Sequence, residues 1–320
     1  MSEQGDADGR AESVCVTGAS SQLGIFLLPR LRAAGYRIVA VSRNAPRRPE
    51  AVNGDVVWAH PERLTTGGRE DGLAGPPKFF VSCGPLDVAR EVISRQRSLQ
   101  RVVAFSSSSV LSKVGSADRG ERGAMALMAQ QEADLVGICT QRKLPLLLLR
   151  PTLIYGCGRD RNVSLLARLA RRFGVIPLAG KAAGRRQPVH ADDLAELAVL
   201  ALGADSPLTM TSAACGGGTL SYREMAEKIA SAVPRRVRLL TLPAGLMAAA
   251  VRLLAPFPPW RGLSAEMVRR QSRDLVFDDS ALRQALDWSP RPFAPTAADF
   301  EVPEYARALQ FNLHPSPDHT

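Results

Sequence analysis

A glycine-containing turn joins an apolar strand pattern to an amphipathic helix pattern at residues 14–24, VCVTGASSQLG. The β-branched residues before the turn predict a strand, and Leu23, Leu27 and Leu31 recur after it at helical spacing. The first turn of such a helix offers unpaired backbone N–H groups and the positive end of the helix dipole, which suit a phosphate. The unit therefore predicts an α/β fold whose first helix receives the pyrophosphate of a dinucleotide.

The glycine spacing of this turn departs from a G-x-x-G-x-x-G pattern at its middle position. Gly18 and Gly24 are present, whereas Ser21 stands where the chain should approach the phosphates most closely. Glycines at such junctions also serve packing alone, so the turn by itself is weak evidence. The strand before it and the helix after it favour the cofactor site over a packing role.

Strand and helix patterns alternate through the first half of the chain at the spacing of a doubly wound parallel sheet. We expect strands at 13–17, 36–41, 55–59, 78–83, 101–106 and 145–150, and helices at 22–34, 86–97 and 119–141. The uninterrupted leucine run at 146–149 is typical of a strand buried on both faces. The predicted fold is α/β, with a doubly wound parallel Rossmann sheet and a smaller C-terminal α/β domain on the substrate side.

Beyond Pro151 the alternation becomes irregular, which suits a smaller domain that closes over a cofactor. Helices are expected at 162–173, 191–203 and 221–233, with short strands at 175–178 and 208–213; Ser221 and Glu224 have the spacing of a capping box. We expect a disordered leader at 1–12, a dinucleotide-binding domain at 13–160 and a substrate or partner domain at 161–320, from which residues 187–213 return to the sheet.

The charge and composition narrow the class of partner. The net charge of +10 comes mainly from dispersed arginines, and only 5% of residues are aromatic, which favours small phosphate-bearing ligands over nucleic acid. No apolar run is long enough to span a bilayer, and the first dozen residues lack the apolar core of a signal peptide. The five scattered cysteines are typical of buried thiols in a reducing compartment, and their spacing with the four histidines predicts no metal site. We expect a cytoplasmic protein, either free or peripheral to the inner face of a membrane.

One apolar segment, residues 238–260, has two interpretations. Leu246, Ala249 and Leu253 fit helical spacing, and Arg252 is the charge in the segment's interior. A helix of this kind packs in a core or a dimer interface, or it presents a face to a membrane surface or a partner complex. The pattern leaves both alternatives open.

Several stretches of the chain resemble the extended short-chain dehydrogenase/reductases, the epimerase/dehydratase group. They are TGASSQLG at 17–24, FSSSSV at 105–110 and RPTLIYG at 150–156, with a closing strand and turn at 274–278 and 288–290. Residues 186–195, RQPVHADDLA, match an R-x-x-x-H-x-x-D-L-A element that supplies a diphosphate-binding arginine in sugar-nucleotide epimerases. Residues 158–178 resemble the atypical branch that contains the NADPH-holding accessory subunit of respiratory complex I, which keeps the nucleotide without a functioning catalytic pair.

This resemblance implies roles for individual residues. The cofactor-binding set is Gly18, Ser20, Ser21, Gln22, Leu23, Gly24, Arg43, Cys83, Gly84, Ser106, Pro151 and Leu153. The substrate-side set is Arg161, Asn162, Arg186 and His190, of which we expect His190 to be a packed, hydrogen-bonded residue rather than a general base. Ser107 corresponds to the catalytic serine, although serines at strand ends also satisfy loop backbone groups.

The proton-transfer pair of that family is missing from its expected position. The family helix reads Y-x-x-x-K-x-x-x-E, and the frame anchored on Glu132 places Ala124 and Met128 where the tyrosine and lysine belong. No Tyr-x-x-x-Lys occurs anywhere in the chain, and the nearest match, Tyr155 with Arg159, lies in a glycine-rich loop. Lys113 is the lysine nearest to Ser107, either as a stand-in cation or, preferably, as a solvated loop charge.

The end of the second expected strand favours NADP(H) over NAD(H). A carboxylate there would bind the ribose hydroxyls of NAD, whereas arginine accommodates the 2′-phosphate of NADP. The chain has Ser42, Arg43 and Asn44 at this point and no carboxylate. We therefore predict an NADP(H)-holding protein for structural, sensing or non-standard redox use. The alternatives are an NAD(P)-dependent epimerase, dehydratase or reductase acting on a nucleotide-linked or lipid-linked sugar, and a membrane-complex assembly factor.

Overall fold

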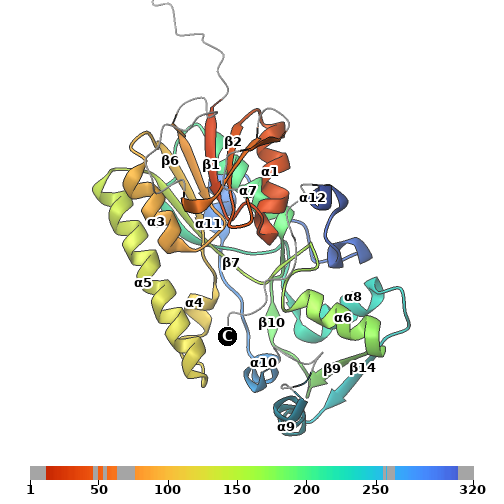
Figure 1. The fold of residues 1–320 in the computed structure, drawn as a ribbon. Helices are drawn as coiled ribbons and strands as arrows, with labels where there is room; N and C mark the ends of the chain where they lie inside the picture. The colour runs from red at the N-terminus through yellow and green to blue at the C-terminus, as the bar shows by residue number, and fades with distance from the viewer. Residues whose placement is uncertain are drawn as a thin grey trace, which may run out of the picture.

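Eight strands form one sheet in the computed structural model of the chain, in the order β12-β7-β6-β5-β1-β2-β4-β3 (Figure 1). The strands are β1 Ser13–Thr17, β2 Arg37–Val41, β3 Glu50–Val52, β4 Val56–Ala59, β5 Phe79–Ser82, β6 Arg101–Phe105, β7 Leu146–Pro151 and β12 Met210–Ala214. All pair in parallel except β3, which runs antiparallel to β4 at the edge. The chain winds outward from β1 in both directions, so the predicted doubly wound Rossmann sheet is confirmed.

The structure describes residues 12–45, 50–52, 56–62, 76–254, 257 and 264–308. The expected leader at 1–12 therefore lies outside the described residues, apart from Glu12.

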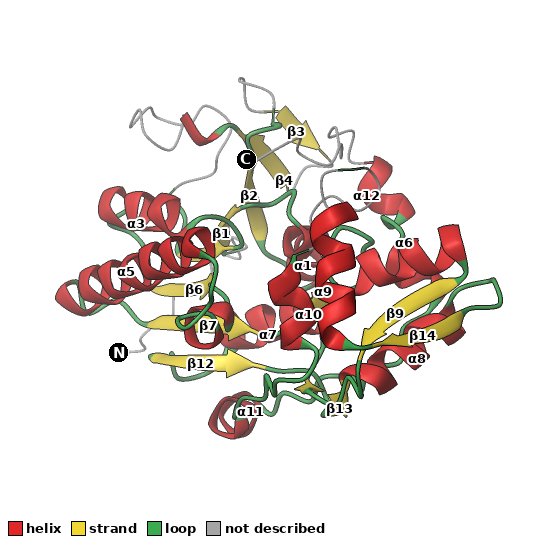
Figure 2. Ribbon diagram, turned by 90° about the horizontal axis from the view of Figure 1, so that it is seen from below, coloured by secondary structure: helices red, strands yellow, loops and turns green. Residues whose placement is uncertain are grey.

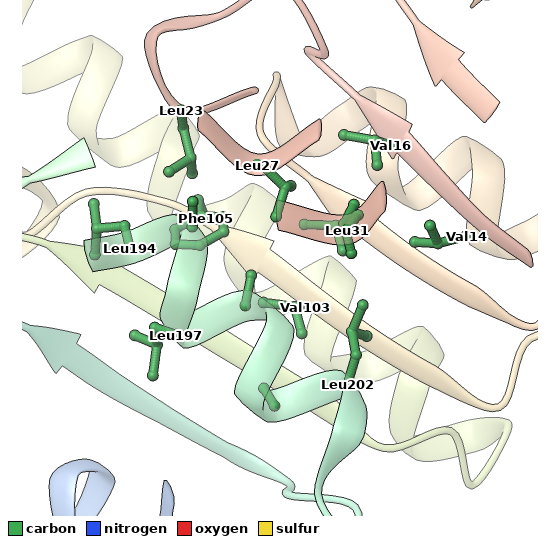
Figure 3. Close-up of a cluster of buried hydrophobic side chains, with 14 of the residues drawn as sticks. Val14, Val16, Leu23, Leu27, Leu31, Val103, Phe105, Leu194, Leu197 and Leu202 are labelled. Carbon is green, nitrogen blue, oxygen red and sulfur yellow. The ribbon is translucent and has the colours of Figure 1, made fainter. Parts of the chain in front are cut away.

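Helices cover both faces of the sheet, and alternate strand residues point to opposite layers. On one face α1 (Gln22–Ala33) and α7 (Ala191–Gly203) pack over Val14 and Val16 (Figure 3). On the other face α3 (Leu86–Arg95) and α5 (Arg119–Gln141) pack over Cys15 and its neighbours. Because both faces are buried, the strands consist of near-continuous apolar residues, as the leucine run of β7 predicted.

A hydrophobic cluster separate from those on the two faces of the sheet holds the C-terminal part of the chain. It joins α6 (Val163–Phe173), β9 (Val175–Ala179) and α8 (Tyr222–Ala232), and β14 (Arg238–Leu242) pairs in parallel with β9. Helices α9 (Ala244–Leu254) and α10 (Ala265–Arg270) lie beside each other near this pair (Figure 2). Shorter elements complete the description: α4 Ser109–Ser112, β8 Ile154–Tyr155, β10 Arg185–Arg186, β11 Val189–His190, β13 Leu220–Ser221, α11 Ser280–Leu286, η1 Ala297–Phe300 and α12 Glu304–Ala308.

Most expected elements are confirmed within one or two residues, and the expected helix at 119–141 is α5 itself. The capping box of α8 is present, with Ser221 and Glu224 bonding each other's backbone amides. The expected strand at 274–278 is wrong. This segment is not in a ladder: the amide of Leu275 bonds the carbonyl oxygen of Arg185 in β10, but the amide of Phe277, two residues further on, bonds the side-chain oxygen of Gln187 and ends the pairing.

Two further observations concern the membrane and the cysteines. None of the described helices is both long and apolar enough to cross a membrane. All five cysteines are free thiols, and four of them are buried. Burial raises the pKa of the Cys157 thiol to about 11 and that of Cys215 to about 12, as expected for inert packed side chains.

Candidate functional site

The glycine turn after β1 lies against the end of β5, at the point where the strand order reverses. Gly18 has a φ of +66°, and a β-carbon there would lie 2.5 Å from the carbonyl carbon of Cys83. The amide of Gly84 would also be only 2.7 Å from that β-carbon. Position 18 therefore requires glycine for both its conformation and its close approach to β5. In doubly wound sheets this crevice at the carboxyl ends of the strands is where ligands bind.

Gly24 brings the first turn of α1 onto the glycine turn. A β-carbon at Gly24 would lie 2.3 Å from the carbonyl oxygen of Ala19, so any side chain would force the helix away. The two glycines of the motif thus fix the turn from both sides.

Ser21 is the N-cap of α1, which explains why serine fits the middle position of the motif. Its hydroxyl accepts a hydrogen bond from the amide of Gly24 at 3.1 Å, and the amide of Ile25 bonds the Ser21 carbonyl. The amides of Gln22 and Leu23 have no acceptor within the helix, as in any first turn. They remain the donors that a phosphate at this end of α1 would meet.

Two buried polar atoms near this crevice have no hydrogen-bond partner among the described residues. They are Nε2 of Gln22, in the first turn of α1, and Oγ of Ser106, immediately after β6. Buried polar groups are normally satisfied, so such orphaned atoms fit a site that a polar ligand completes. Together with the glycine cradle, they fit the pyrophosphate and ribose groups of a dinucleotide.

The end of β2 carries hydroxyl groups. Oγ of Ser42 lies 2.7 Å from Oγ of Ser20 in the glycine turn, and it accepts from the amide of Asn44 at 3.2 Å. Arg43 is exposed beside this pair. The side chains of 46–49 lie outside the described residues, so Arg43 is the described cation of this segment.

Arg159 reaches the glycine turn from a different part of the chain. It lies in the loop between β8 and α6, and its Nη1 donates to the carbonyl oxygen of Ser20 at 2.6 Å. The one sequence signal for this residue was its place in the glycine-rich loop that follows Tyr155, but the role considered there was proton transfer. Sequence reasoning therefore missed its contact with the cofactor turn.

Helix α5 carries Ala124 and Met128, the two residues that the sequence frame assigns to the family's tyrosine and lysine positions. Ala124 is exposed and Met128 is partly buried, one helical turn apart. One turn further, the buried Glu132 accepts from Nε of Arg150 at 3.1 Å and from its Nη2 at 2.5 Å. This ion pair joins α5 to β7 and fixes which face of α5 lies toward the strand ends.

The serine and lysine near these positions already have partners. Oγ of Ser107 accepts from the amide of Ser109 at 3.2 Å, as a serine that satisfies loop backbone would. Nζ of Lys113 lies 3.2 Å from Oε1 of Glu121, and Nη2 of Arg270 in α10 lies 2.9 Å from the same oxygen. Burial opposes ionisation of Glu121, but hydrogen bonds from Arg270, Ser116 and Lys113 lower the pKa of its carboxyl to about 2.

His190 is packed and hydrogen-bonded, as the sequence predicted. It is 4% exposed, its Nδ1 accepts from the amide of Asp192, and its Nε2 lies 3.1 Å from Oδ1 of Asp299. The tautomer that satisfies both contacts carries its proton on Nε2. Tyr155 meets the ring edge-on at 4.9 Å between centroids. These contacts leave His190 without the free nitrogen that a general base needs.

The other predicted substrate-side residues lie in two environments. Arg161 and Asn162 are exposed just before α6. Arg186 is only 4% exposed, and its guanidinium donates to the backbone carbonyls of residues 185, 270 and 273. Because burial lowers its pKa and carbonyl groups occupy its donors, this geometry does not support the expected diphosphate role of Arg186.

The remaining predicted cofactor residues follow the ends of β5 and β7. Cys83 and Gly84 lie against Gly18, and Pro151 is buried at the end of β7, whereas Leu153 is partly buried against the hydrophobic cluster of the C-terminal part.

One described cluster has ligand atoms spaced for a metal ion: His190, Asp192 and Asp193. Its carboxylates already face cations, because Arg30 lies 2.6 Å from Asp192 and Arg291 lies 2.6 Å from Asp193. Burial raises the pKa of Asp192, but hydrogen bonds from Arg30 and Arg291 outweigh it and lower that pKa to about 2. The cluster is thus an arginine–aspartate network that ties α1 to α7.

With this geometry in place, comparison with solved structures defines the fold. MoeE5, solved in complex with UDP-glucuronic acid and NAD, superposes with a TM-score of 0.64 at 18% identity, covering 93% of this chain and 99% of that one. The chain has the fold of the extended short-chain dehydrogenase/reductases. No protein-family model matches the sequence.

Curated relatives match only part of the chain. A UDP-glucose 4-epimerase from Vibrio cholerae is 22% identical over 162 residues, which are 51% of this chain and 47% of that protein. An uncharacterized protein, y4nG, from Sinorhizobium fredii is 28% identical over 153 residues, 46% of this chain and 37% of that protein. The matched region thus spans less than half of each relative.

Proposed function

We propose that this chain binds a nicotinamide dinucleotide at the turn between β1 and α1 and holds it without the tyrosine–lysine proton relay. The observation that carries the proposal is the Gly18 turn, pressed against Cys83 and Gly84, with the unpaired amides of α1 facing the crevice. The MoeE5 structure, which has the same fold, is a complex with NAD and UDP-glucuronic acid. When bound, such a cofactor supplies hydride transfer; the residues of this chain supply its binding and orientation.

We favour NADP(H) over NAD(H) because of the groups at the end of β2. Hydroxyl groups of Ser42 and Ser20 occupy the position where a carboxylate would bind the ribose of NAD and repel a 2′-phosphate. Arg43 follows directly, and its guanidinium is suited to phosphate.

The groups around α5 favour a protein that binds the dinucleotide over an enzyme that turns over a substrate rapidly. Ala124 and Met128 have no ionisable group, and Glu121 is held as a carboxylate by Arg270, Ser116 and Lys113. None of these three residues can donate a proton near neutral pH. The loss of a proton-transfer group costs roughly 10²–10⁴-fold in rate, so residual turnover at most is expected.

A titration tests the cofactor proposal directly. Purified protein is titrated with NADPH and with NADH while nucleotide fluorescence is followed, and NADPH should bind more tightly. Arg43→Ala should weaken NADPH by about tenfold and leave NADH unchanged, because one phosphate contact is lost. Arg236→Ala, which removes an exposed arginine between α8 and β14, is the matched control for charge. Equal affinities of the wild type for NADPH and NADH would contradict the proposal that Arg43 makes the site prefer NADP(H).

The second candidate is an epimerase, dehydratase or reductase acting on a nucleotide-linked or lipid-linked sugar. The fold and the Vibrio cholerae relative favour it. Wild type and the double variant Ala124→Tyr with Met128→Lys are incubated with NAD and UDP-glucose or UDP-glucuronic acid. Turnover in the wild type supports this candidate, whereas turnover only in the double variant supports loss of the relay from an ancestral site.

We also propose that α9 presents an apolar face to an anionic membrane surface. Met247 and Val251 pack inward, whereas Leu246 and Leu253 are 58% and 73% exposed. Exposed Arg252 lies on the same helix, and the net charge of +10 suits anionic lipid. Residues 255–256 and 258–260 of the expected segment lie outside the described residues.

Flotation with vesicles that contain anionic lipid tests this face. The double variant Leu246→Glu with Leu253→Glu should lose vesicle binding. Leu127→Glu, which changes an equally exposed leucine on α5, should retain it. Identical flotation of all three proteins would dismiss the membrane surface. A wild type that binds no vesicles but binds a protein complex, and loses that complex in the Leu246→Glu, Leu253→Glu variant, would instead favour an assembly role.

A further inference from the structure

An arginine in the loop between β8 and α6 contacts the glycine turn between β1 and α1. Nη1 of Arg159 donates to the carbonyl oxygen of Ser20 at 2.6 Å, although the two residues are 139 positions apart. Ser20 immediately precedes the N-cap of α1, so the guanidinium lies beside the positive end of that helix. A second positive group is placed where the helix dipole is already positive, which is unfavourable unless an anion joins them.

The backbone on both sides of Arg159 is fixed. Gly158 has a φ of +70°, and a β-carbon there would lie 2.4 Å from the carbonyl oxygen of Phe300. On the other side the buried carboxylate of Asp160 accepts from the amides of Asn162 and Ser164 at 2.9 and 3.0 Å. The arginine therefore projects from a rigid loop and is not a freely moving surface charge.

Most N–H donors of the Arg159 guanidinium are not used by the described residues. In the part of the chain that the structure describes, its bond to Ser20 is the one hydrogen bond of its guanidinium. An arginine carries several N–H donors in a planar fork that matches phosphate oxygens. The carbonyl contact thus orients the fork while most donors remain available to a ligand.

We propose that Arg159 binds the pyrophosphate of the dinucleotide, beside the amides of Gln22 and Leu23 at the same end of α1. This inference rests on the proposed function. The pyrophosphate is common to NAD(H) and NADP(H), so Arg159 contributes equally to both. Arg43, at the end of β2, contributes to NADP(H) alone. The two arginines therefore separate overall affinity from cofactor preference.

Binding measurements on the full chain separate this role from the alternatives. Arg159→Ala should raise the Kd of NADPH and of NADH by the same factor, between about 10-fold and 100-fold, as expected for a charge-assisted hydrogen bond. Arg159→Lys should recover part of the loss, because it retains the charge without the fork. The same titrations with ADP and with adenosine should show a loss for ADP and none for adenosine. Arg236→Ala is the matched control.

Each other outcome has a distinct meaning. A loss confined to NADPH would place Arg159 at the 2′-phosphate and overturn the inference. Equal losses for ADP and adenosine would show that the arginine only shapes the turn, and unchanged affinities would exclude any contact; both results overturn it. A wild type that binds neither dinucleotide refutes the proposed function itself, which these variants do not address.

Discussion

Glu132 and Arg150 form an ion pair that sets the rotation of α5 against the sheet. The Glu132 side chain is 5% exposed and accepts hydrogen bonds from Nε and Nη2 of Arg150, which lies near the end of β7. Because residues four apart share a helix face, this pair also determines where Met128 and Ala124 lie. The ion pair therefore holds the face of α5 that carries the two residues which the sequence frame assigns to the proton-relay positions.

Removal of one partner from this pair should be costly. Glu132→Ala leaves the Arg150 charge largely buried and unpaired, and we expect it to lower the free energy of unfolding by about 3 kcal/mol. Urea unfolding measures the change. Glu91→Ala breaks an exposed ion pair with Arg95 on α3 and should cost less than about 1 kcal/mol. Similar losses for the two variants would contradict the structural importance of the Glu132 pair.

Gly156 is required by its contact with His190. Its φ is +126°, and a β-carbon would lie 2.4 Å from Nε2 of His190. Gly156→Ala should therefore destabilise the fold by about 2–4 kcal/mol, through backbone strain and displacement of the imidazole. Thermal unfolding with Gly137→Ala as control checks this, because Gly137 lies in α5 with open space around it. The control should be slightly stabilising; a stable Gly156→Ala would show that the ring moves away freely.

The carboxylate of Glu121 predicts a pH dependence of stability. Its pKa in the folded chain is about 2, against an ordinary value of 4.5, because the hydrogen bonds from Arg270, Ser116 and Lys113 outweigh the effect of burial. A lowered folded pKa gives stability that is fully present above about pH 4.5 and is lost as the pH falls toward 2.

Glu121→Gln should accordingly flatten the dependence of unfolding free energy on pH between 5 and 3. Glu91→Gln, which removes an exposed carboxylate, should leave the slope as it is in the wild type. Parallel slopes for wild type and Glu121→Gln would contradict the link that this residue makes between α5 and α10.

The Asp192 network should couple α1 to α7. Asp192→Asn removes the charge that faces both Arg30 and Arg291, at 2.6 and 2.7 Å. Two partly exposed arginines then lose their shared counter-ion, and we expect a loss of about 1–2 kcal/mol in unfolding free energy at neutral pH. Asp134→Asn on the exposed side of α5 is the control. If urea unfolding shows the same free energy of unfolding for Asp192→Asn and the wild type, solvent screens the charges of the network.

The elements that could be predicted from sequence are those with local signals. The capping box at Ser221 and the long periodic pattern of α5 depend on neighbouring residues, and both were located correctly. Strand β14 was not predicted, because it is defined by its pairing with the distant strand β9 and no local signal separates it from the apolar helix pattern that follows. Long-range contacts also explain why the role expected for Arg186 was not supported and why the contact of Arg159 was missed. A motif shows that an arginine is present, but only the fold shows which carbonyl groups it contacts.

Native mass spectrometry of the freshly purified protein tests the central claim most directly. We expect the wild type to carry an adduct with the mass of NADP(H), or to acquire it from a micromolar supply, and to bind NAD(H) more weakly. A Gly18→Ala variant should lose the adduct, since its β-carbon would press into Cys83 and Gly84. If the folded wild type carries no dinucleotide and takes up neither NADP(H) nor NAD(H) at millimolar concentration, the proposed cofactor site is wrong.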